Sequence, residues 1–239
     1  MIKIGIVTYN RKTVKTMNIL TAWKRKDIII STQTREDYER IRAMYGNKAN
    51  VIYSPADSCS TNRNNLLDYM QRNGIKECIL LDDDIINIGF LRDNKLVPIL
   101  PDELPTILEH LVSVARINNA PIFGFYPCYN AFFMGKGIRR QYIVIGTVFG
   151  MLNTQLRFDP SMRVKEDYEL CCRVINKGYN CLRFDFLATN ANHYTKGGCE
   201  MDWAAPQVAQ YALWLEDLYP HLIKAVNGEV RYIGNKEIL

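Results

Sequence analysis

Short apolar runs alternate with amphipathic segments along the first 85 positions of the chain. The apolar, β-branched runs predict buried strands, and the segments between them have the residue spacing of helices. The predicted strands are Ile2–Thr8, Asp27–Thr32, Asn50–Ser54 and Ile79–Leu81, and the predicted helices are Thr13–Trp23, Arg35–Tyr45 and Ser60–Arg72. This strand–helix alternation favours an α/β fold with a doubly wound, mostly parallel sheet.

The second half of the chain has a less regular pattern. It predicts strands at Ile122–Tyr126, Tyr142–Leu152 and Leu182–Leu187, and a short strand or turn at Leu96–Leu100. The predicted helices are Asp102–Asn118, Glu166–Lys177 and Trp203–Val226. Asn130–Gln141 is predicted as a loop or hairpin, and Thr189–Met201 as a loop. The last helix contains Pro206 and Pro220, which punctuate it. Because the sequence has no internal repeat, low-complexity tract or linker, we expect residues 1–239 to form one domain with two unequal halves.

Three adjacent carboxylates, Asp82, Asp83 and Asp84, directly follow the apolar run Ile79–Leu81. Open α/β sheets bind their ligands at the carboxyl ends of the strands, which is where these residues fall. Their charges repel one another, and a hard divalent cation such as Mg²⁺ or Mn²⁺ relieves that repulsion through carboxylate, water and phosphate oxygens. The alternative is a solvated acidic turn after a strand.

Composition narrows the class of protein only slightly. Hydrophobic residues make up 48% and charged residues 23%, as in ordinary globular proteins. No apolar run approaches the roughly 20 residues of a membrane helix, and the start MIKIGIVTYNRK has the pattern of a strand rather than a signal peptide. The seven cysteines are scattered without a C-x-x-C pair, so we expect reduced thiols in a cytoplasmic protein. The net charge of +5 is compatible with a nucleotide or nucleic-acid partner.

A second acidic stretch, Glu166–Asp167, opens the predicted helix Glu166–Lys177. Carboxylates at a helix start are commonly simple caps, because the helix dipole favours negative charge there. Together with the three aspartates about 80 residues earlier, they also fit a catalytic pair. No Gly-x-Gly-x-x-Gly or Walker-type Gly-Lys-Ser/Thr motif follows the first strand, which argues against a dinucleotide-binding or P-loop protein.

Together these motifs resemble those of the GT-A glycosyltransferases, a sugar-nucleotide-dependent family with an Asp-x-Asp metal motif. The markers are the IGIVTYNR strand, the Thr61–Asn64 helix start, Asp82–Asp84, Phe158–Asp159 and the Glu166–Gly178 helix. Within that family, the segments VKEDYEL and NHYTKGG look like those of glycosyltransferases associated with TET/JBP-type oxygenases in phages. The resemblance implies a GT-A fold with a mixed, mostly parallel sheet flanked by helices. It also implies a nucleotide-binding half at residues 1–100 and an acceptor and catalytic half at residues 101–239.

The resemblance assigns one group of residues to the sugar-nucleotide donor. Asp84 and Asp82 would hold Mn²⁺ or Mg²⁺, with His193 as a third metal ligand, and Asp82 would also contact the ribose. The residues expected to contact the nucleotide and its diphosphate are Thr8, Tyr9, Asn10, Arg11, Arg63, Asp82, Asp83 and Lys196. A metal ion there neutralises the departing nucleoside diphosphate.

A second group would activate the acceptor. The resemblance makes Asp167 the general base that takes the proton of the attacking hydroxyl, with Glu166 as the competing candidate, and implies inversion at the sugar carbon. The basic loop Lys136–Arg140, with Phe132, Phe133 and Tyr142 nearby, is the candidate acceptor contact. The alternative for this loop is a solvated hairpin tip whose aromatic rings pack inward, and we slightly favour that alternative.

We therefore expect a metal-dependent, inverting glycosyltransferase that uses a UDP-sugar, UDP-glucose or UDP-GlcNAc, and acts on a 5-hydroxymethylpyrimidine in DNA without a membrane partner. If the chain is phage-encoded, it would act in the host cytoplasm. The alternatives are a glycan, lipid or protein acceptor, and a sugar-nucleotide-binding module without turnover. A nucleotidyltransferase is a further alternative, but it normally has a Gly-rich basic loop after the first strand, where VTYNRK offers only Arg11 and Lys12.

Overall fold

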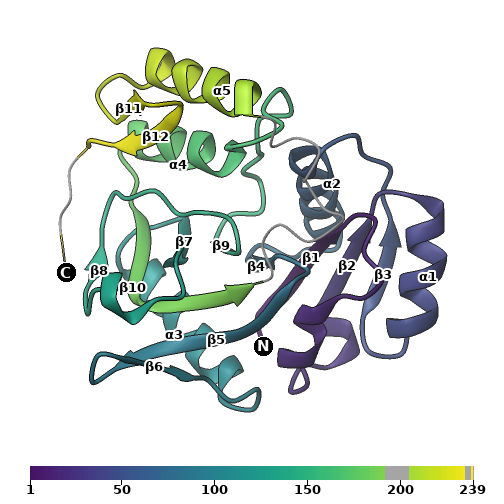
Figure 1. Cartoon of the computed structure of the whole chain (residues 1–239). Coiled ribbons are helices and arrows are strands. Elements are labelled where there is room, and N and C mark those ends of the chain that lie inside the picture. The colour runs from purple at the N-terminus through teal and green to yellow at the C-terminus, as the bar shows by residue number, and fades with distance from the viewer. Residues whose placement is uncertain (192–204, 235–237, 239) are drawn as a thin grey trace.

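One mixed sheet runs through the computed structural model, which describes residues 1–191, 205–234 and 238 (Figure 1). Within these residues the sheet has ten strands in the order β3-β2-β1-β4-β9-β7-β10-β5-β6, and β8 pairs with β10 off this path. The strands are β1 (Lys3–Thr8), β2 (Ile28–Thr32), β3 (Asn50–Tyr53), β4 (Cys78–Leu81), β5 (Ile85–Arg92), β6 (Lys95–Pro98), β7 (Ile122–Tyr126), β8 (Ile138–Arg139), β9 (Val148–Met151) and β10 (Cys181–Ala191).

Helices cover both faces of this sheet. The α-helices are α1 (Arg35–Tyr45), α2 (Cys59–Arg72), α3 (Leu104–Ile117), α4 (Glu166–Asn176) and α5 (Ala205–Leu218), and the 3-10 helices are η1 (Lys15–Ile19), η2 (Arg25–Asp27) and η3 (Ala131–Phe133). A separate hairpin, β11 (Ile223–Val226) with β12 (Glu229–Tyr232), follows α5. This is the mixed, mostly parallel α/β sheet flanked by helices that the sequence predicts.

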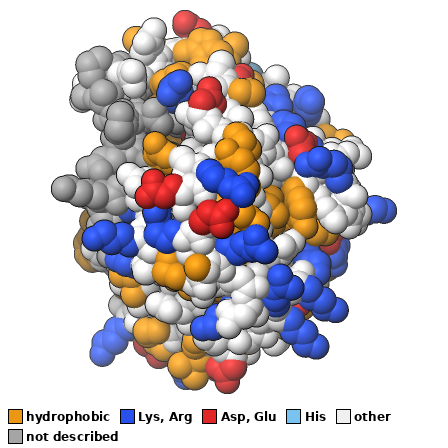
Figure 2. Space-filling view, turned by 90° about the vertical axis from the view of Figure 1, so that its right-hand side faces the viewer, with side chains coloured by type: hydrophobic (Ala, Val, Ile, Leu, Met, Phe, Trp, Pro, Cys, Tyr) orange, Lys and Arg blue, Asp and Glu red, His pale blue; other side chains and the backbone are white. Residues whose placement is uncertain are grey.

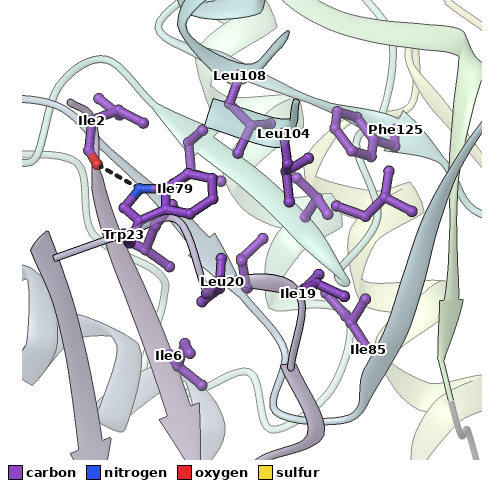
Figure 3. Packing of buried hydrophobic residues seen from close by; sticks show 14 of the residues in the cluster. Ile2, Ile6, Ile19, Leu20, Trp23, Ile79, Ile85, Leu104, Leu108 and Phe125 are labelled. Carbon is purple, nitrogen blue, oxygen red and sulfur yellow. Dashed lines mark hydrogen bonds between the residues drawn. The ribbon is translucent and has the colours of Figure 1, made fainter. Parts of the chain in front are cut away.

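Two buried clusters divide the core between the two faces. One joins η1, α1 and α3 to the sheet, and in it the Trp23 indole donates a hydrogen bond to the carbonyl of Ile2 at 3.3 Å (Figure 3). The other joins α2, α4, α5 and the β11–β12 hairpin to the opposite face. Because apolar side chains of β1 and β4 enter both clusters, these two central strands are buried on both sides, and the residues at their ends have fixed positions.

The directions of the strands bring several chain segments to one sheet edge. β1 pairs in parallel with β4, while β9 lies antiparallel between β4 and β7. β4 and β7 therefore run the same way, and β10 is parallel to β7. The carboxyl ends of β1, β4, β7 and β10 consequently lie side by side. They form one edge of the sheet that is made of strand ends, and α/β sheets place their ligand sites there.

The predicted helix Thr13–Trp23 is wrong, because only the 3-10 turn η1 forms there. Successive backbone bonds in this segment span three residues, and the buried side chains follow the same interval: Val14, Met17, Leu20 and Trp23. A period of three fits a 3-10 chain path rather than the 3.6-residue turn of an α-helix.

Several other elements differ from the sequence prediction. The predicted strand Tyr142–Leu152 is too long, because β9 covers only Val148–Met151. The predicted helix Trp203–Val226 is too long, because α5 ends at Leu218 and the chain then turns into the β11–β12 hairpin after Pro220. β10 extends into the predicted loop as far as Ala191, and β5, directly after the aspartates, was not predicted. Among the described residues, no helix has the length and apolar character needed to cross a membrane.

Candidate active site

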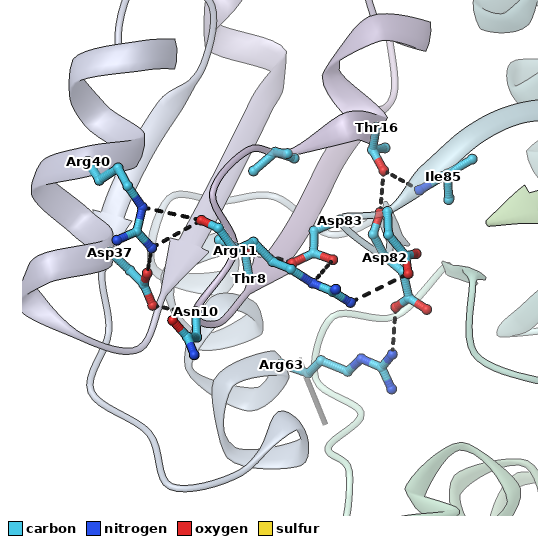
Figure 4. Close-up of polar contacts among 12 residues, drawn as sticks. Thr8, Asn10, Arg11, Thr16, Asp37, Arg40, Arg63, Asp82, Asp83 and Ile85 are labelled. Atoms are coloured by element: carbon cyan, nitrogen blue, oxygen red, sulfur yellow. Dashed lines mark hydrogen bonds and ion pairs between the residues drawn. The ribbon is translucent and has the colours of Figure 1, made fainter. Parts of the chain in front are cut away.

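The three aspartates lie in the short turn between β4 and β5, at the sheet edge described above (Figure 4). Backbone and side-chain bonds fix this turn from two sides. The Thr16 hydroxyl donates to the Asp82 carbonyl at 2.5 Å and accepts the N–H of Ile85 at 3.0 Å, while the Asp82 N–H donates to the carbonyl of Thr147 at 3.1 Å. These contacts hold the aspartates in place because both ends of the turn are hydrogen-bonded to other elements.

Asp83 points back toward β1. Its carboxylate accepts the Thr8 hydroxyl at 2.6 Å and lies 3.3 Å from the Arg11 guanidinium, which also lies 3.5 Å from Asp84. Burial raises the pKa of Asp83 to about 7, although Arg11 and Thr8 oppose the rise. Asp83 therefore fixes the segment that follows β1, and among the three aspartates it has the clearest structural role.

Arg63 of α2 joins the two acidic stretches of the sequence. Its guanidinium donates to Glu166 at 2.6 Å and to Asp82 at 3.1 Å, and its side chain is only 6% exposed. It also lies over the ring of Phe158, 5.3 Å from the ring centroid. Because Arg63 is charged and buried, it draws β4 and the start of α4 together into one site.

Glu166 and Asp167 begin α4, but they have different partners. Glu166 is paired with Arg63, whereas Asp167 accepts backbone N–H groups from Gly146 and Tyr168, both at 2.9 Å. Burial raises the pKa of Glu166 to about 7, and burial also raises the pKa of Asp167. The Glu166 carboxylate is committed to its ion pair, whereas the Asp167 carboxylate is hydrogen-bonded by backbone N–H groups, so Asp167 is the better-placed proton acceptor.

Lys165 precedes this pair in a left-handed conformation, with φ of 61°. Its side chain is 3% exposed, and its ammonium contacts Glu229 of the C-terminal hairpin at 3.1 Å and lies 5.3 Å from the Tyr168 ring centroid. Left-handed backbone is unusual for a residue other than Gly or Asn, and the surrounding contacts stabilise it here. The start of α4 is thus anchored on the side opposite Arg63 as well.

The residues expected to line the nucleotide after β1 lie together, but their surroundings were not predicted. Tyr9 is 39% exposed, and Asn10 is left-handed with φ of 52°. The N–H of Asn10 donates to Asp37 at 2.8 Å, and the Arg40 guanidinium donates to the carbonyl of Arg11 at 3.0 Å. The sequence predicts the helix Arg35–Tyr45 but not this contact, because its approach to the loop depends on the tertiary fold.

The oxygen ligands at this edge fit a hard divalent cation in kind. Five carboxylates meet two guanidinium groups here. Burial raises the pKa of Asp82 to about 6; the Arg63 guanidinium opposes this rise, and the charges of Asp84 and Asp167 add to it. The Asp82 side chain is 31% exposed, so solvent limits this rise. Within residues 1–191, 205–234 and 238, no three His, Cys, Asp or Glu side chains are placed to hold a metal. A site of one or two carboxylates completed by phosphate and water remains compatible with the chemistry of Mg²⁺ and Mn²⁺.

Two predicted site residues, His193 and Lys196, lie outside the described residues. The structure brings the other predicted residues to one sheet edge: Thr8, Tyr9, Asn10, Arg11, Arg63, Asp82, Asp83, Asp84, Glu166 and Asp167. Residues that support them and were not predicted are Thr16, Asp37, Arg40, Gly146 and Thr147.

The favoured alternative for the basic loop, that its aromatic rings pack inward, is wrong for two of the three rings. Phe132 is 86% exposed and Phe133 is 59% exposed. Tyr142 packs against Tyr232, with ring centroids 4.9 Å apart. The central carbon of the Arg183 guanidinium lies 4.2 Å from the centroid of the Tyr142 ring. The loop thus has an anchored end at Tyr142 and an exposed aromatic end.

The chain matches the model of a known protein family. A family model described as TET-associated glycosyltransferase matches residues 3–198. Among solved structures, a crystal structure of S. aureus TarS residues 1–349 in complex with UDP is similar, with a TM-score of 0.46 and 10% sequence identity; the match covers 90% of this chain and 66% of that chain. A likeness of this degree decides neither fold nor function. No curated protein matches the chain.

Proposed function

The chain belongs to the family of TET-associated glycosyltransferases, and from this membership we propose that it moves a sugar from a UDP-sugar to the hydroxyl of a 5-hydroxymethylpyrimidine in DNA. The family supplies the class of reaction. The acceptor rests on the association with TET oxygenases, whose chemistry produces hydroxymethylated bases. UDP-glucose and UDP-GlcNAc are the candidate donors.

One observation carries the proposal: Arg63 bonds Asp82 after β4 and Glu166 at the start of α4, so that two acidic stretches distant in sequence form one site. A glycosyl transfer needs a charged donor region next to a proton acceptor. The β4 turn has the carboxylates for the first requirement, and α4 has Asp167 for the second.

On the donor side, Asp84 and Asp82 are the residues that would hold the metal ion. When bound, Mn²⁺ or Mg²⁺ supplies positive charge that stabilises the departing diphosphate. Thr8, Tyr9, Asn10 and the two arginines at this edge would contact the nucleotide, while Asp83 positions the loop after β1 through the Thr8 hydroxyl. This assigns the donor to residues 1–100.

On the acceptor side, Asp167 takes the proton of the attacking hydroxyl, and the oxygen of that hydroxyl bonds to the anomeric carbon on the face opposite the leaving group. The configuration of the sugar carbon is therefore inverted. The N–H groups of Gly146 and Tyr168 orient the carboxylate, since each donates to one of its oxygens. Glu166 holds Arg63 instead. This assigns the acceptor chemistry to residues 101–239.

The test is nucleoside mass spectrometry after incubation of the protein with Mn²⁺, mixed UDP-sugars and DNA that contains 5-hydroxymethylcytosine, with unmodified DNA as the control. A hexose or N-acetylhexosamine mass added only to the hydroxymethylated nucleoside is the expected result. Metal-dependent release of UDP without an adduct on DNA would point to a glycan, protein or lipid acceptor. Binding of the UDP-sugar without adduct or UDP release would indicate a sugar-nucleotide-binding module.

A further inference from the structure

The segment of residues 127–147 connects β7 to β9 around β8 (Figure 1). It exposes two neighbouring aromatic rings. Phe132 and Phe133 of η3 lie edge to face, with ring centroids 5.1 Å apart. At 86% and 59% exposure they are among the most exposed large apolar side chains of the described residues. Exposure of two adjacent phenylalanines costs solvation free energy, and such patches mark interaction sites.

A rigid framework holds these rings. The Asn130 side chain accepts the N–H of Phe132 at 3.0 Å, which closes the turn before η3. Farther along the segment, β8 pairs with β10, and Arg139 contacts Asp185 at 2.5 Å. Because both flanks of the ring pair are hydrogen-bonded, the rings are presented in a defined place rather than on a free loop.

The charge of the segment is of one sign. Residues 127–147 include three cations, Lys136, Arg139 and Arg140, and no carboxylate. Arg139 shares the Asp185 carboxylate with Arg183, which lies 2.6 Å from it. Within the described part of the chain Lys136 and Arg140 have no ion-pair partner, and the Arg140 Nε is buried without a hydrogen bond. Cations beside exposed aromatic rings are the combination that binds a single nucleic-acid strand, since phosphates meet the charges and bases stack on the rings.

The segment also leads into the candidate active site. It leaves the carboxyl end of β7, at the same sheet edge as the aspartates after β4. Its last two residues are Gly146, whose N–H donates to Asp167 at 2.9 Å, and Thr147, whose carbonyl accepts the N–H of Asp82 at 3.1 Å. One continuous segment therefore carries both the exposed rings and two backbone groups that hold the candidate site.

We propose that residues 127–147 bind an unpaired stretch of the acceptor DNA, with bases stacked on Phe132 and Phe133 and phosphates beside Lys136 and Arg140. The inference rests on the proposed function for its acceptor, and it adds that the target base is taken from an unpaired strand. Stacking on a side chain requires a base whose face is free, which a closed duplex offers only at its ends.

A rival surface lies on the other side of the molecule, where Lys and Arg side chains gather along the right of the view in Figure 2. There a cavity of about 510 Å³ at the edge strand β3 is lined in part by Arg35, Tyr38, Tyr53 and Arg72. Arg35 is already paired there: it lies over the rings of Tyr38 and Tyr53, 5.4 and 5.8 Å from their centroids, and its Nε lies 3.1 Å from the Glu39 carboxylate. We therefore place the strand on residues 127–147.

The test is fluorescence anisotropy with a labelled, unmodified 20-nucleotide oligothymidylate. The double variant Phe132→Ala/Phe133→Ala should weaken binding about 10- to 100-fold, as expected for the loss of base stacking. Lys136→Ala/Arg140→Ala should weaken binding and flatten its dependence on salt. The matched controls are Ile117→Ala, an equally exposed apolar side chain on α3, and Lys95→Ala, an exposed lysine on β6; both should bind like the wild type.

This assay needs neither donor nor transfer, so its outcome is independent of the proposed function. Failure of sugar transfer to DNA, with binding that depends on the phenylalanines, would refute the reaction and keep the strand-binding surface. The surface itself is overturned if the wild type does not bind the oligonucleotide or if the phenylalanine variant binds equally well. It is also overturned if Arg35→Ala/Arg72→Ala alone removes binding, or if duplex DNA of the same length binds more tightly than the single strand.

Discussion

The turn after β4 and the segment after β7 leave the same sheet edge, yet they treat charge in opposite ways. After β4, carboxylates are buried and held by arginines from elsewhere in the fold, as in the contact of Arg11 with Asp83. After β7, the cations have no carboxylate in their own segment, and two aromatic rings are exposed. The same edge therefore carries an anionic interior, suited to a cation and a diphosphate, beside a cationic rim suited to a polyanion.

A finer contrast separates two neighbours on α4. Glu166 is neutralised by a buried guanidinium, whereas Asp167 is held by backbone N–H groups. The same turn of helix therefore presents one carboxylate that stabilises the site and one that is left to accept a proton.

The largest expected effect is on transfer when Asp167 is changed. Asp167→Asn should lower the rate of sugar transfer by roughly 10²- to 10⁴-fold, the usual contribution of a general base, because the amide cannot take the acceptor proton. The measurement is the initial rate of UDP release in the presence of acceptor. Asp217→Asn, an exposed carboxylate on α5, is the control and should leave the rate unchanged. A rate loss that is larger for Glu166→Gln than for Asp167→Asn would reverse the assignment of the two neighbours.

The next effect is on stability when Arg63 is removed. Arg63→Met leaves Glu166 buried without its partner, and breaking a buried ion pair costs about 3–5 kcal/mol. For a chain of this size that corresponds to a fall in Tm of roughly 6–20 °C, measurable by calorimetry. The double variant Arg63→Met/Glu166→Gln should recover part of the loss. If Arg63→Met melts like the wild type, the two acidic stretches are not held together by this side chain.

The smallest effect concerns pH. The pKa of Glu166 is raised by burial from 4.5 to about 7, so the folded protein keeps this proton at pH values where the unfolded chain has lost it. The stability that the proton contributes is fully present below pH 4.5 and is lost as the pH rises to about 7. Glu166→Gln should therefore lose less stability than the wild type between pH 5 and 8 in urea unfolding. The control is Glu39→Gln, which removes an exposed carboxylate paired with Arg35. It should keep the wild-type dependence of stability on pH.

The site could be predicted from the sequence where its signal is local. An apolar strand that ends in Asp82–Asp84, and a helix that begins with Glu166–Asp167, are patterns within a few residues. The bond between Arg63 and Glu166 joins positions 103 residues apart, so no spacing in the sequence indicates it. The exposure of Phe132 escaped prediction for a related reason, since burial depends on which elements cover a side chain.

The fold, like the site, could be predicted from the sequence where the pattern is local. The strands β1, β2 and β4 were predicted because their apolar runs are short and buried on both faces. The segment Thr13–Trp23 was assigned to a helix because intervals of three and four apolar positions are hard to distinguish over eleven residues. The end of α5 at Leu218 depends on the hairpin that packs against it, which a helical apolar pattern does not reveal.

The most direct test of the central claim, that the β4 turn holds the donor and α4 holds the base, is calorimetric titration of UDP in the presence of Mn²⁺ against two variants. Asp167→Asn should bind UDP like the wild type, whereas Asp84→Asn should lose the Mn²⁺-dependent part of the binding. Equal loss in both variants, or equal retention in both, would contradict the division of the site between the two acidic stretches.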